Sequence, residues 1–340
     1  MAVTRLAPLD PRWSGWLASR PDATLFHHPA WLRVVAGTYR YPSFVLAVSD
    51  DRGLRFGLPV VEISRAGLGR RWVSLPFTDW CPPLMDDGVG AAELVALLDE
   101  ARREAGVNQL EVRGALIHDG EPAEVGHRHV LRLGDDAQAL FGAFHPSQVQ
   151  RSIRKAEREG VVVRRSTSSS DLLDHFYRLH VQTRRRQGVP VQPRAFFRLI
   201  ADEVLARDLG FLLLASHGGR TVAAALFLAW NGTIIYKFGA SEAAAWPVRP
   251  NHAIFWEAIQ WGSANGFHTL DFGRTDFDTP GLRTFKLHWG SEEHPLVYST
   301  LGGPRRVGAG RASHLVGPLI RHSPAWVARG IGELFYRFAA

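Results

Sequence analysis

Short apolar strands and amphipathic helices alternate along this chain, and the pattern occurs twice. From Phe44 the sequence FVLAVSDDRGLRFGLPVVEI reads as two apolar strands joined by a DDRG turn. From Phe211 the sequence FLLLASHGGRTVAAALFLAW has the same form, with HGGR as its turn. Each segment therefore predicts a β-hairpin, and the two hairpins read as copies of one unit.

Further elements follow each hairpin in the same order. Residues 70–77 and 232–239 each predict a third strand, and residues 108–114 and 267–273 each predict a fourth. Between them, GAAELVALLDEARREAG and NHAIFWEAIQWGSANG predict amphipathic helices that end at glycine. A helix also precedes each hairpin, as HPAWLRVVAG and as SDLLDHFYRLHVQTRRRQG. The repeat predicts two tandem α/β domains, each with the order helix, hairpin, strand, helix, strand.

The order of these elements resembles the layout of the N-acetyltransferase (GNAT) fold. The resemblance implies two tandem GNAT-like domains with mixed sheets flanked by helices, over residues 1–147 and 148–302. In the remaining segment, residues 303–340, Ser323 and Pro324 predict the start of a helix. One face of that helix is apolar, and we expect it to dock against the protein's own core. The apolar residues are Val327, Ile331, Leu334, Phe335 and Phe338.

Composition limits the class of protein. The net charge of +7 suggests anionic partners such as phosphates, nucleic acid or a lipid surface, or else a solvated basic surface. Cys81 is the single cysteine, which excludes a disulfide framework, and the 15 histidines show no HExxH or paired spacing, so we expect no metal site. The longest apolar runs are about half a membrane span and no signal-peptide core is evident, so we expect a cytoplasmic protein.

Five blocks in order resemble the Fem (FemA/FemB/FemX-like) aminoacyltransferases and their acetyltransferase-like bacterial relatives. The blocks are HPSQVQRSIRKAEREGVVV, FYRLHVQTRRRQGVPVQPRAFFRLI, YKFGAS, DFGR and GLRTFKLHWG. The resemblance implies an active cleft between the domains and a C-terminal segment that packs back on the first domain. It also implies transfer of an amino acid from aminoacyl-tRNA to an amine of a peptide or a cell-envelope precursor.

The segments that would bind acetyl-CoA lack its usual motif. GNAT enzymes hold the pyrophosphate on backbone amides of an R-x-x-G-x-G loop between their own fourth strand and the following helix, and that strand corresponds to the third strand predicted in each copy here. The corresponding segments here are PFTDWCPPLMDDGVG and ASEAAAWPVRPN, in which prolines remove amide donors. A literal match at 305–310, RRVGAG, follows the last strand and so lies at the wrong topological place. We therefore expect no cofactor, and a donor such as aminoacyl-tRNA.

A basic stripe supports that choice of donor. In the alternative interpretation the helix is only a solvated surface helix, and Glu157 and Glu159 balance the positive charge of the stripe. A stripe of this kind can follow the phosphates of tRNA, and we expect Lys237 and Arg274 to contribute to the donor side as well. The stripe consists of four residues with the spacing of one helical face: Arg151, Arg154, Lys155 and Arg158.

The scarcity of lysine draws attention to position 286. Of the 40 Lys and Arg residues only three are lysines, Lys155, Lys237 and Lys286, and all three fall in the blocks above. Ammonium is a compact charge that can aim at one oxygen, which the broad guanidinium group cannot do as well. In the Fem family an F-K pair borders the catalytic cleft, and it corresponds here to Phe285 and Lys286. We expect Lys286 to stabilise the oxyanion of acyl transfer; the alternative is a lysine at a helix end.

Other residues receive weaker assignments. Asp271 or Asp276 could take the proton of the attacking amine, although either could be a cap or turn residue. Tyr236 lies on the strand beside the expected cleft, and alternation directs either Tyr236 or Lys237 inward.

On the first domain, three residues are assigned to the acceptor. Arg33 matches a basic position that holds an acceptor phosphate in Fem relatives, and Asp79 and Trp80 occupy the loop where the acceptor would bind. Core packing is the alternative for Trp80.

Two further functions remain open at this point. One is an N-acyltransferase that uses acyl-CoA or another thioester in envelope polysaccharide or secondary-metabolite biosynthesis. The other is a non-catalytic protein that binds an anionic membrane through the basic stripe and the C-terminal helix. In either case we expect the protein in the cytoplasm or peripheral at the cytoplasmic face of the membrane, in contact with the inner membrane surface.

Overall fold

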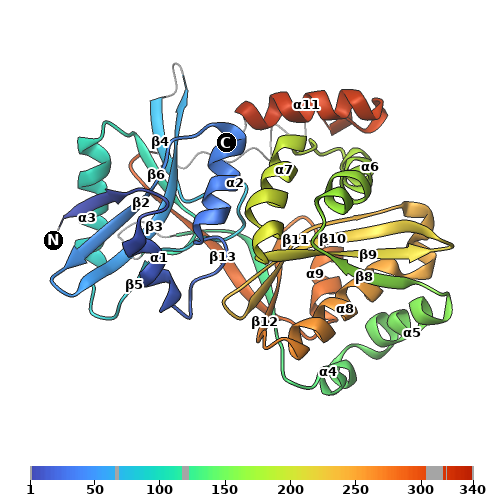
Figure 1. Ribbon diagram of the computed structural model, residues 1–340. Coiled ribbons are helices and arrows are strands. Elements are labelled where there is room, and N and C mark those ends of the chain that lie inside the picture. The colour runs from blue at the N-terminus through green and yellow to red at the C-terminus, as the bar shows by residue number, and fades with distance from the viewer. Residues whose placement is uncertain (1, 66–68, 117–121, 304–316, 319, 339–340) are drawn as a thin grey trace. The chain divides into compact units, whose positions relative to one another are not determined.

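The computed structural model describes residues 2–65, 69–116, 122–303, 317–318 and 320–338 (Figure 1). The chain divides into two compact units. The first unit runs from the N-terminus to Gly126 and resumes at Pro295, and the second unit runs from His127 to His294 and includes the C-terminal helix. Each unit is a mixed α/β fold, as the repeat in the sequence predicts.

The first unit is built on a mixed sheet with the strand order β1-β2-β3-β4-β6, and β5 pairs with β3. The predicted hairpin is the pair β2–β3, and β4 pairs with β6 in parallel through residues 71–73 and 109–111. Its strands are β1 (Val3–Leu6), β2 (Ser43–Asp50), β3 (Gly53–Arg65), β4 (Gly69–Val73), β5 (Leu84–Met85) and β6 (Gln109–Val112). Its helices are α1 (Pro11–Ala18), α2 (Pro29–Tyr39) and α3 (Ala91–Glu104).

The second unit repeats this plan with the strand order β12-β11-β10-β9-β8. The predicted hairpin is β9–β10, and β11 pairs with β12 in parallel. Its strands are β8 (Val162–Ser166), β9 (Gly210–His217), β10 (Arg220–Trp230), β11 (Thr233–Ser241) and β12 (Thr269–Thr275). Its helices are α4 (Ala137–Ala143), η1 (Pro146–Gln150), α5 (Arg151–Arg158), η2 (Asp171–Phe176), α6 (Tyr177–Gln187), α7 (Arg194–Glu203), η3 (Leu205–Arg207), η4 (Ala243–Val248), α8 (Pro250–Ala264) and α9 (Pro280–Leu287).

Two strands that the sequence did not predict complete the sheets. The strand β7 (Ala123–Arg132) follows β6 in the chain, but its residues 127–132 pair with β12 of the second unit. The strand β13 (Glu292–Leu301) follows α9, but its residues 299–301 pair with β6 of the first unit. The unit boundaries therefore lie inside these two strands, rather than at the expected positions 147/148 and 302/303.

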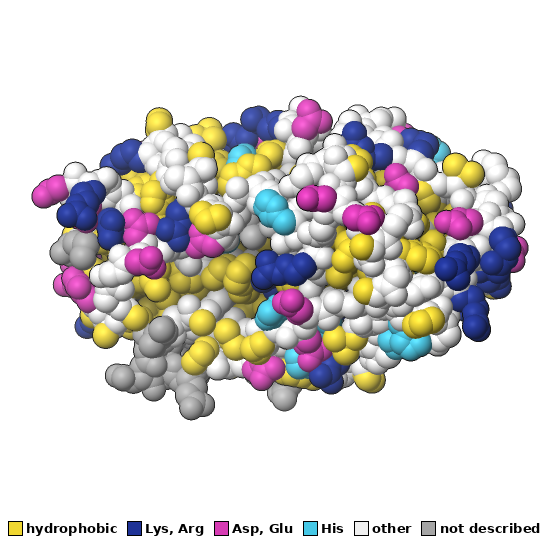
Figure 2. Space-filling model, turned by 90° about the horizontal axis from the view of Figure 1, so that it is seen from below, with side chains coloured by type: hydrophobic (Ala, Val, Ile, Leu, Met, Phe, Trp, Pro, Cys, Tyr) yellow, Lys and Arg dark blue, Asp and Glu magenta, His cyan; other side chains and the backbone are white. Residues whose placement is uncertain are grey.

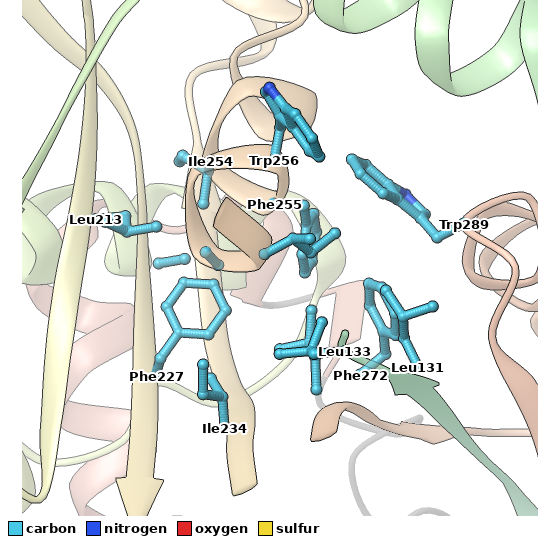
Figure 3. Packing of buried hydrophobic residues seen from close by; sticks show 14 of the residues in the cluster. Leu131, Leu133, Leu213, Phe227, Ile234, Ile254, Phe255, Trp256, Phe272 and Trp289 are labelled. Atoms are coloured by element: carbon cyan, nitrogen blue, oxygen red, sulfur yellow. The ribbon is translucent and has the colours of Figure 1, made fainter. Parts of the chain in front are cut away.

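The core of the second unit is apolar and rich in aromatic rings (Figure 3). Pro250 occupies the first turn of α8, and the helix buries Ile254, Phe255 and Ile259 against the sheet. Phe227 of β10 is fully buried below this helix. The strands β9 and β10 read as nearly continuous apolar runs because helices cover both of their faces.

The C-terminal helix α11 (Ala325–Phe338) packs against α6 of the second unit. The close approach depends on Gly332, because a Cβ atom there would lie 2.0 Å from the carbonyl oxygen of Val191. Ala328, one turn earlier, is also fully buried. The helix therefore docks on the second unit, while packing of residues 303–340 on the first domain stays a prediction.

The start of this helix also differs from the prediction. Ser323 Oγ donates to the carbonyl oxygen of Ile320 instead of capping the helix, while Val327 and Ile331 are half-buried as their spacing predicts. The side chains of Leu334, Phe335 and Phe338 lie outside the described residues. Among the helices that the structure describes, none combines the length and the apolar character needed to cross a membrane.

Candidate active site

The parallel strands β11 and β12 part in the middle of the second unit. They pair only through Thr233–Ile235 and Thr269–Asp271, although the strands continue to Ser241 and Thr275. Residues Tyr236–Gly239, directly after the last pair, are half-buried in a strand whose neighbours in sequence are fully buried. We call this opening the wedge; it lies between Tyr236–Gly239 of β11 and 272–275 of β12. Backbone groups on the facing edges of parted strands are available to a ligand.

Both strands bulge where they part. On β11, Tyr236 pairs with Phe227 and Phe238 pairs with Leu226, so that Lys237 is the extra residue. On β12, two residues between Asp271 and Arg274 oppose the single residue His129 of β7. The second of these is Gly273, whose φ of 72° lies in the left-handed region that favours glycine. A bulge leaves its extra residue outside the ladder and bends the strand, which accounts for the opening.

Lys286 and Asp271 hold the bulge of β12. The Lys286 side chain is only 3% exposed, and its Nζ donates to the carbonyl oxygens of Gly273 and Arg274 at 2.8 and 2.9 Å. Asp271 Oδ1 accepts from the backbone N–H of Gly273 at 2.8 Å, and Asp271 Oδ2 accepts from Arg128 Nε at 2.6 Å. Both side chains therefore fix backbone geometry beside the wedge. The oxyanion role of Lys286 and the proton-accepting role of Asp271 stay predictions.

A histidine that the sequence reasoning missed lies behind the bulge. His129 is fully buried; its Nδ1 is 3.3 Å from Thr275 Oγ1 and its Nε2 is 3.1 Å from Glu293 Oε2. Burial, reinforced by the charge of Lys286, lowers the pKa of His129 to about 4, so the ring is neutral at pH 7. The only signal in the sequence was the repeated histidine in HRH of β7, which carries meaning only once β7 is paired with β12.

Glu293, which contacts this histidine, and Asp276, the residue after Thr275, each pair with an arginine. Glu293 accepts two hydrogen bonds from the Arg283 guanidinium, at 2.6 and 2.7 Å, and this contact lowers the pKa of the Glu293 carboxyl. Arg274 Nε donates to Asp276 Oδ1 at 2.5 Å on the surface. The exposed Asp276 therefore forms a local ion pair, and its role as a proton acceptor stays a prediction.

Tyr236 and Phe285 belong to one aromatic cluster. The Tyr236 ring is 4.8 Å from Phe255, and Phe285 is 5.8 Å from the same ring. The Tyr236 hydroxyl lies over Gly239, where an added Cβ would be 1.8 Å from it. Burial raises the pKa of Tyr236 to about 12, so its hydroxyl is protonated and can donate a hydrogen bond at the wedge.

The basic stripe forms the outer face of α5, as predicted. Arg151, Arg154 and Arg158 are exposed and Lys155 is half-buried, whereas Ile153 and Ala156 on the opposite face are buried. Figure 2 shows Lys and Arg side chains gathered at the end of the second unit where α5 lies. Lys237, the other lysine assigned to the donor, has its Nζ 5.4 Å from the centroid of the Phe238 ring.

The connection from β11 to α8 contains the short helix η4 in place of a glycine-rich loop. Pro247 lies within η4, and Pro250 is the first residue of α8. Arg249 between them adopts a φ of 60°. Trp246 packs the connection, with its Nε1 donating to Ser241 Oγ at 3.0 Å. The RRVGAG match at 305–310 lies outside the described residues.

The three residues assigned to the acceptor lie in the first unit. Arg33 is half-buried on α2, and the backbone carbonyl of Asp79 accepts from Tyr298 Oη at 2.8 Å. Trp80 packs against a small cluster that includes Leu296, which agrees with core packing as its alternative role. Binding of an acceptor here stays a prediction. All the catalytic and donor residues assigned from the sequence lie in the second unit.

Comparison with known proteins identifies the fold. Residues 143–286 match the family model of an acetyltransferase (GNAT) domain. No curated protein sequence matches the chain significantly. The structure is similar to the crystal structure of FemX, with a TM-score of 0.71 and 15% identity over 88% of this chain and 97% of that chain.

Two other solved structures have the same fold at lower similarity. The C-terminal domain of a putative lysylphosphatidylglycerol synthetase from Agrobacterium fabrum has a TM-score of 0.57 and 14% identity, over 91% of this chain and 95% of that one. A tandem GNAT protein from the clavulanic acid biosynthesis pathway has a TM-score of 0.53 and 12% identity, over 89% of this chain and 99% of that one. Residues 143–286 are therefore a GNAT acetyltransferase domain, the protein is an acyltransferase, and its fold is shared with FemX and with the tandem GNAT protein.

Proposed function

We propose that the protein transfers an amino acid from aminoacyl-tRNA to an amine of a peptide or a cell-envelope precursor. The observation that carries the proposal is the connection between β11 and α8. In this connection η4 and two prolines replace the glycine-rich turn on which GNAT enzymes bind pyrophosphate. A donor without that pyrophosphate contact fits the connection better than acetyl-CoA does.

The basic face of α5 supports a polynucleotide donor. Three exposed arginines and one lysine follow one side of this helix, and a face of this kind neutralises successive phosphates. The fold shared with FemX and with the lysylphosphatidylglycerol synthetase domain agrees with the same reaction class. In this proposal the protein acts in the cytoplasm, on an acceptor in solution or at the inner membrane surface.

The wedge offers hydrogen-bond donors for acyl transfer. The reaction joins the acceptor nitrogen to the ester carbonyl and breaks the bond from that carbonyl to the tRNA ribose oxygen. The developing oxyanion needs hydrogen-bond donors, which the Tyr236 hydroxyl and backbone N–H groups at the Lys237 bulge can provide. The amine gives up a proton and the departing ribose oxygen takes one. The bulge held by Lys286 and Asp271 keeps β12 apart from β11, so the carbonyl can enter between them.

Competition between donors tests this function. The protein is incubated with total tRNA charged with labelled amino acids, with labelled acetyl-CoA, and with a panel of amines, and the loss of label from each donor is followed. We expect amine-dependent loss of label from the tRNA. The double variant Arg154→Gln/Arg158→Gln should raise the KM for charged tRNA, whereas Arg198→Gln, an exposed arginine on α7, should not.

One observation favours a second donor, acyl-CoA. The matched family model is that of an acetyltransferase, and the tandem GNAT protein of the clavulanic acid pathway is described in a form without AcCoA. Loss of label from acetyl-CoA alone would establish this second function and exclude the first. Retention of label on both donors, with every amine in the panel, would contradict both.

A further inference from the structure

Two polar residues on α6, His180 and Arg184, form a cluster beside the wedge. His180 and Arg184 are four residues apart and so lie on the same face of the helix. Both contact Phe238 of the wedge: the His180 ring is 5.5 Å from the Phe238 ring, and the Arg184 guanidinium carbon is 5.9 Å from its centroid. The cluster therefore borders the wedge from the side of α6.

The Nδ1 atom of His180 has no hydrogen-bond partner among the described residues. The side chain is only 1% exposed, and its Nε2 is 2.7 Å from Gln192 Oε1. If Nε2 carries the proton donated to this oxygen, Nδ1 carries a lone pair, and no group among the described residues bonds to it. Burial lowers the pKa of His180 to about 3, so the neutral ring persists at physiological pH. A buried acceptor without a partner costs free energy unless a ligand or water supplies a donor.

The Arg184 guanidinium group forms no ion pair with the residues that the structure describes. Its side chain is half-buried, yet no carboxylate lies within ion-pair distance of it in the part of the chain that the structure describes. By contrast, Arg178 on the same helix forms an ion pair with Glu242 at 2.9 Å. A guanidinium group that packs on an aromatic ring and lacks an acidic partner is suited to bind a carboxylate or a phosphate through two parallel hydrogen bonds.

The hydroxyl of Tyr236 is the third group with unused bonding capacity. The hydroxyl has no hydrogen-bond partner among the described residues. Burial raises the pKa of Tyr236, and the positive charge of Arg184 partly offsets this rise. His180 and Arg184 contact Phe238, and Tyr236 lies two residues before Phe238 on β11, so a cation, a neutral acceptor and a neutral donor lie along the β11 side of the wedge. Among the described residues, none of the three side chains forms a hydrogen bond or an ion pair with another element there, apart from the contact between His180 and Gln192.

We propose that Arg184 binds an anionic group of the substrate, a carboxylate or a phosphate, while His180 Nδ1 accepts a hydrogen bond from the same substrate. The pair would select substrates in which an oxyanion lies beside an N–H or O–H group, as in an amino acid or a phosphate ester with a neighbouring hydroxyl. This inference rests on the proposed function only in placing acyl transfer at the wedge. It does not depend on the identity of the donor.

Calorimetric titration of the full chain tests the anion site. Inorganic phosphate and acetate are titrated separately at constant ionic strength, with chloride as the reference ion. We expect saturable binding of one of them, weakened about tenfold or more in Arg184→Gln, which corresponds to about 1.4 kcal/mol. Arg198→Gln should bind as the wild type does, and Arg184→Lys should recover part of the affinity. The anion that binds identifies the substrate group as a phosphate or a carboxylate.

Two outcomes would overturn the inference. They are the absence of saturable binding for both anions, and equal affinity in the wild type and in Arg184→Gln when circular dichroism shows both to be folded. A third measurement separates this inference from the proposed function. If tRNA is no donor but Arg184→Gln still loses anion binding, the aminoacyltransferase function fails and the anion site stands.

Discussion

Replacement of Lys286 by methionine tests the most specific structural claim about the wedge. The variant keeps the length of the side chain but removes the ammonium group, whose two hydrogen bonds join α9 to the bulge of β12. Each carbonyl oxygen would lose a charge-assisted partner, worth about 1.5–3 kcal/mol, although relief from burying the charge offsets part of the loss. We expect the free energy of unfolding to fall by about 2–4 kcal/mol.

Urea denaturation followed by circular dichroism measures this change. Typical domains have about 5–15 kcal/mol of stability in total, so the variant should unfold at a clearly lower urea concentration. Lys155→Met is a matched control, because Lys155 lies half-buried on the basic face of α5 and forms no such pair of bonds with any residue that the structure describes. A change below about 0.5 kcal/mol in Lys286→Met would refute the claim that this lysine holds the bulge.

The same variant tests the catalytic role that the sequence suggested. At a temperature where Lys286→Met is folded, loss of an oxyanion donor predicts a decrease in kcat of about 10²–10³-fold. An unchanged kcat would exclude that role and leave Lys286 as a residue that positions β12.

Three further perturbations follow from the structure. In Gly239→Ala the new Cβ would lie 1.8 Å from the Tyr236 hydroxyl, so the Tyr236 side chain must move. We expect the free energy of unfolding to fall by about 1–3 kcal/mol and kcat to decrease. A crystal structure of the variant with Tyr236 in its original position would contradict this. Burial lowers the pKa of His27, His129 and His252 to about 4, below the value near 6.5 of the unfolded chain. Between pH 6.5 and 4 the unfolded state therefore binds more protons than the folded state. As the pH is lowered through this window, the free energy of unfolding should decrease by up to about 1.4 kcal/mol per pH unit for each histidine. A free energy of unfolding that does not change with pH in urea titrations would refute this. Finally, the affinity for charged tRNA is measured by filter binding at several salt concentrations. In Arg154→Gln/Arg158→Gln the slope of log affinity against log salt concentration should become shallower by about 1 for each phosphate that α5 no longer neutralises. An unchanged slope would show that α5 is not part of the donor site.

Local patterns in the sequence were sufficient for the repeated elements. The turns DDRG and HGGR lie between apolar runs, and hairpins form there because the turn chemistry and the strand pattern agree. The stripe on α5 could be predicted for the same reason, since the spacing of its residues alone decides which helical face they share.

Pairing between distant strands could not be read in this way. The strand β7 leaves the first unit to pair with β12, more than 100 residues later, and no local signal specifies that partner. The network of His129, Thr275 and Glu293 depends on this pairing and was missed with it. The bulge at Gly273 also depends on register, although DFGR in the sequence contains the glycine that permits it. The scarcity of lysine drew attention to Lys286, but no pattern in the sequence indicates that its ammonium group bonds to backbone carbonyls.

A crystal structure with a non-hydrolysable aminoacyl-adenosine, the chemical equivalent of the charged end of tRNA, tests the central claim most directly. We predict that its carbonyl group binds between Tyr236–Gly239 of β11 and the bulge of β12, within hydrogen-bond distance of the Tyr236 hydroxyl. Binding of the analogue elsewhere, with the wedge filled only by solvent, would contradict it.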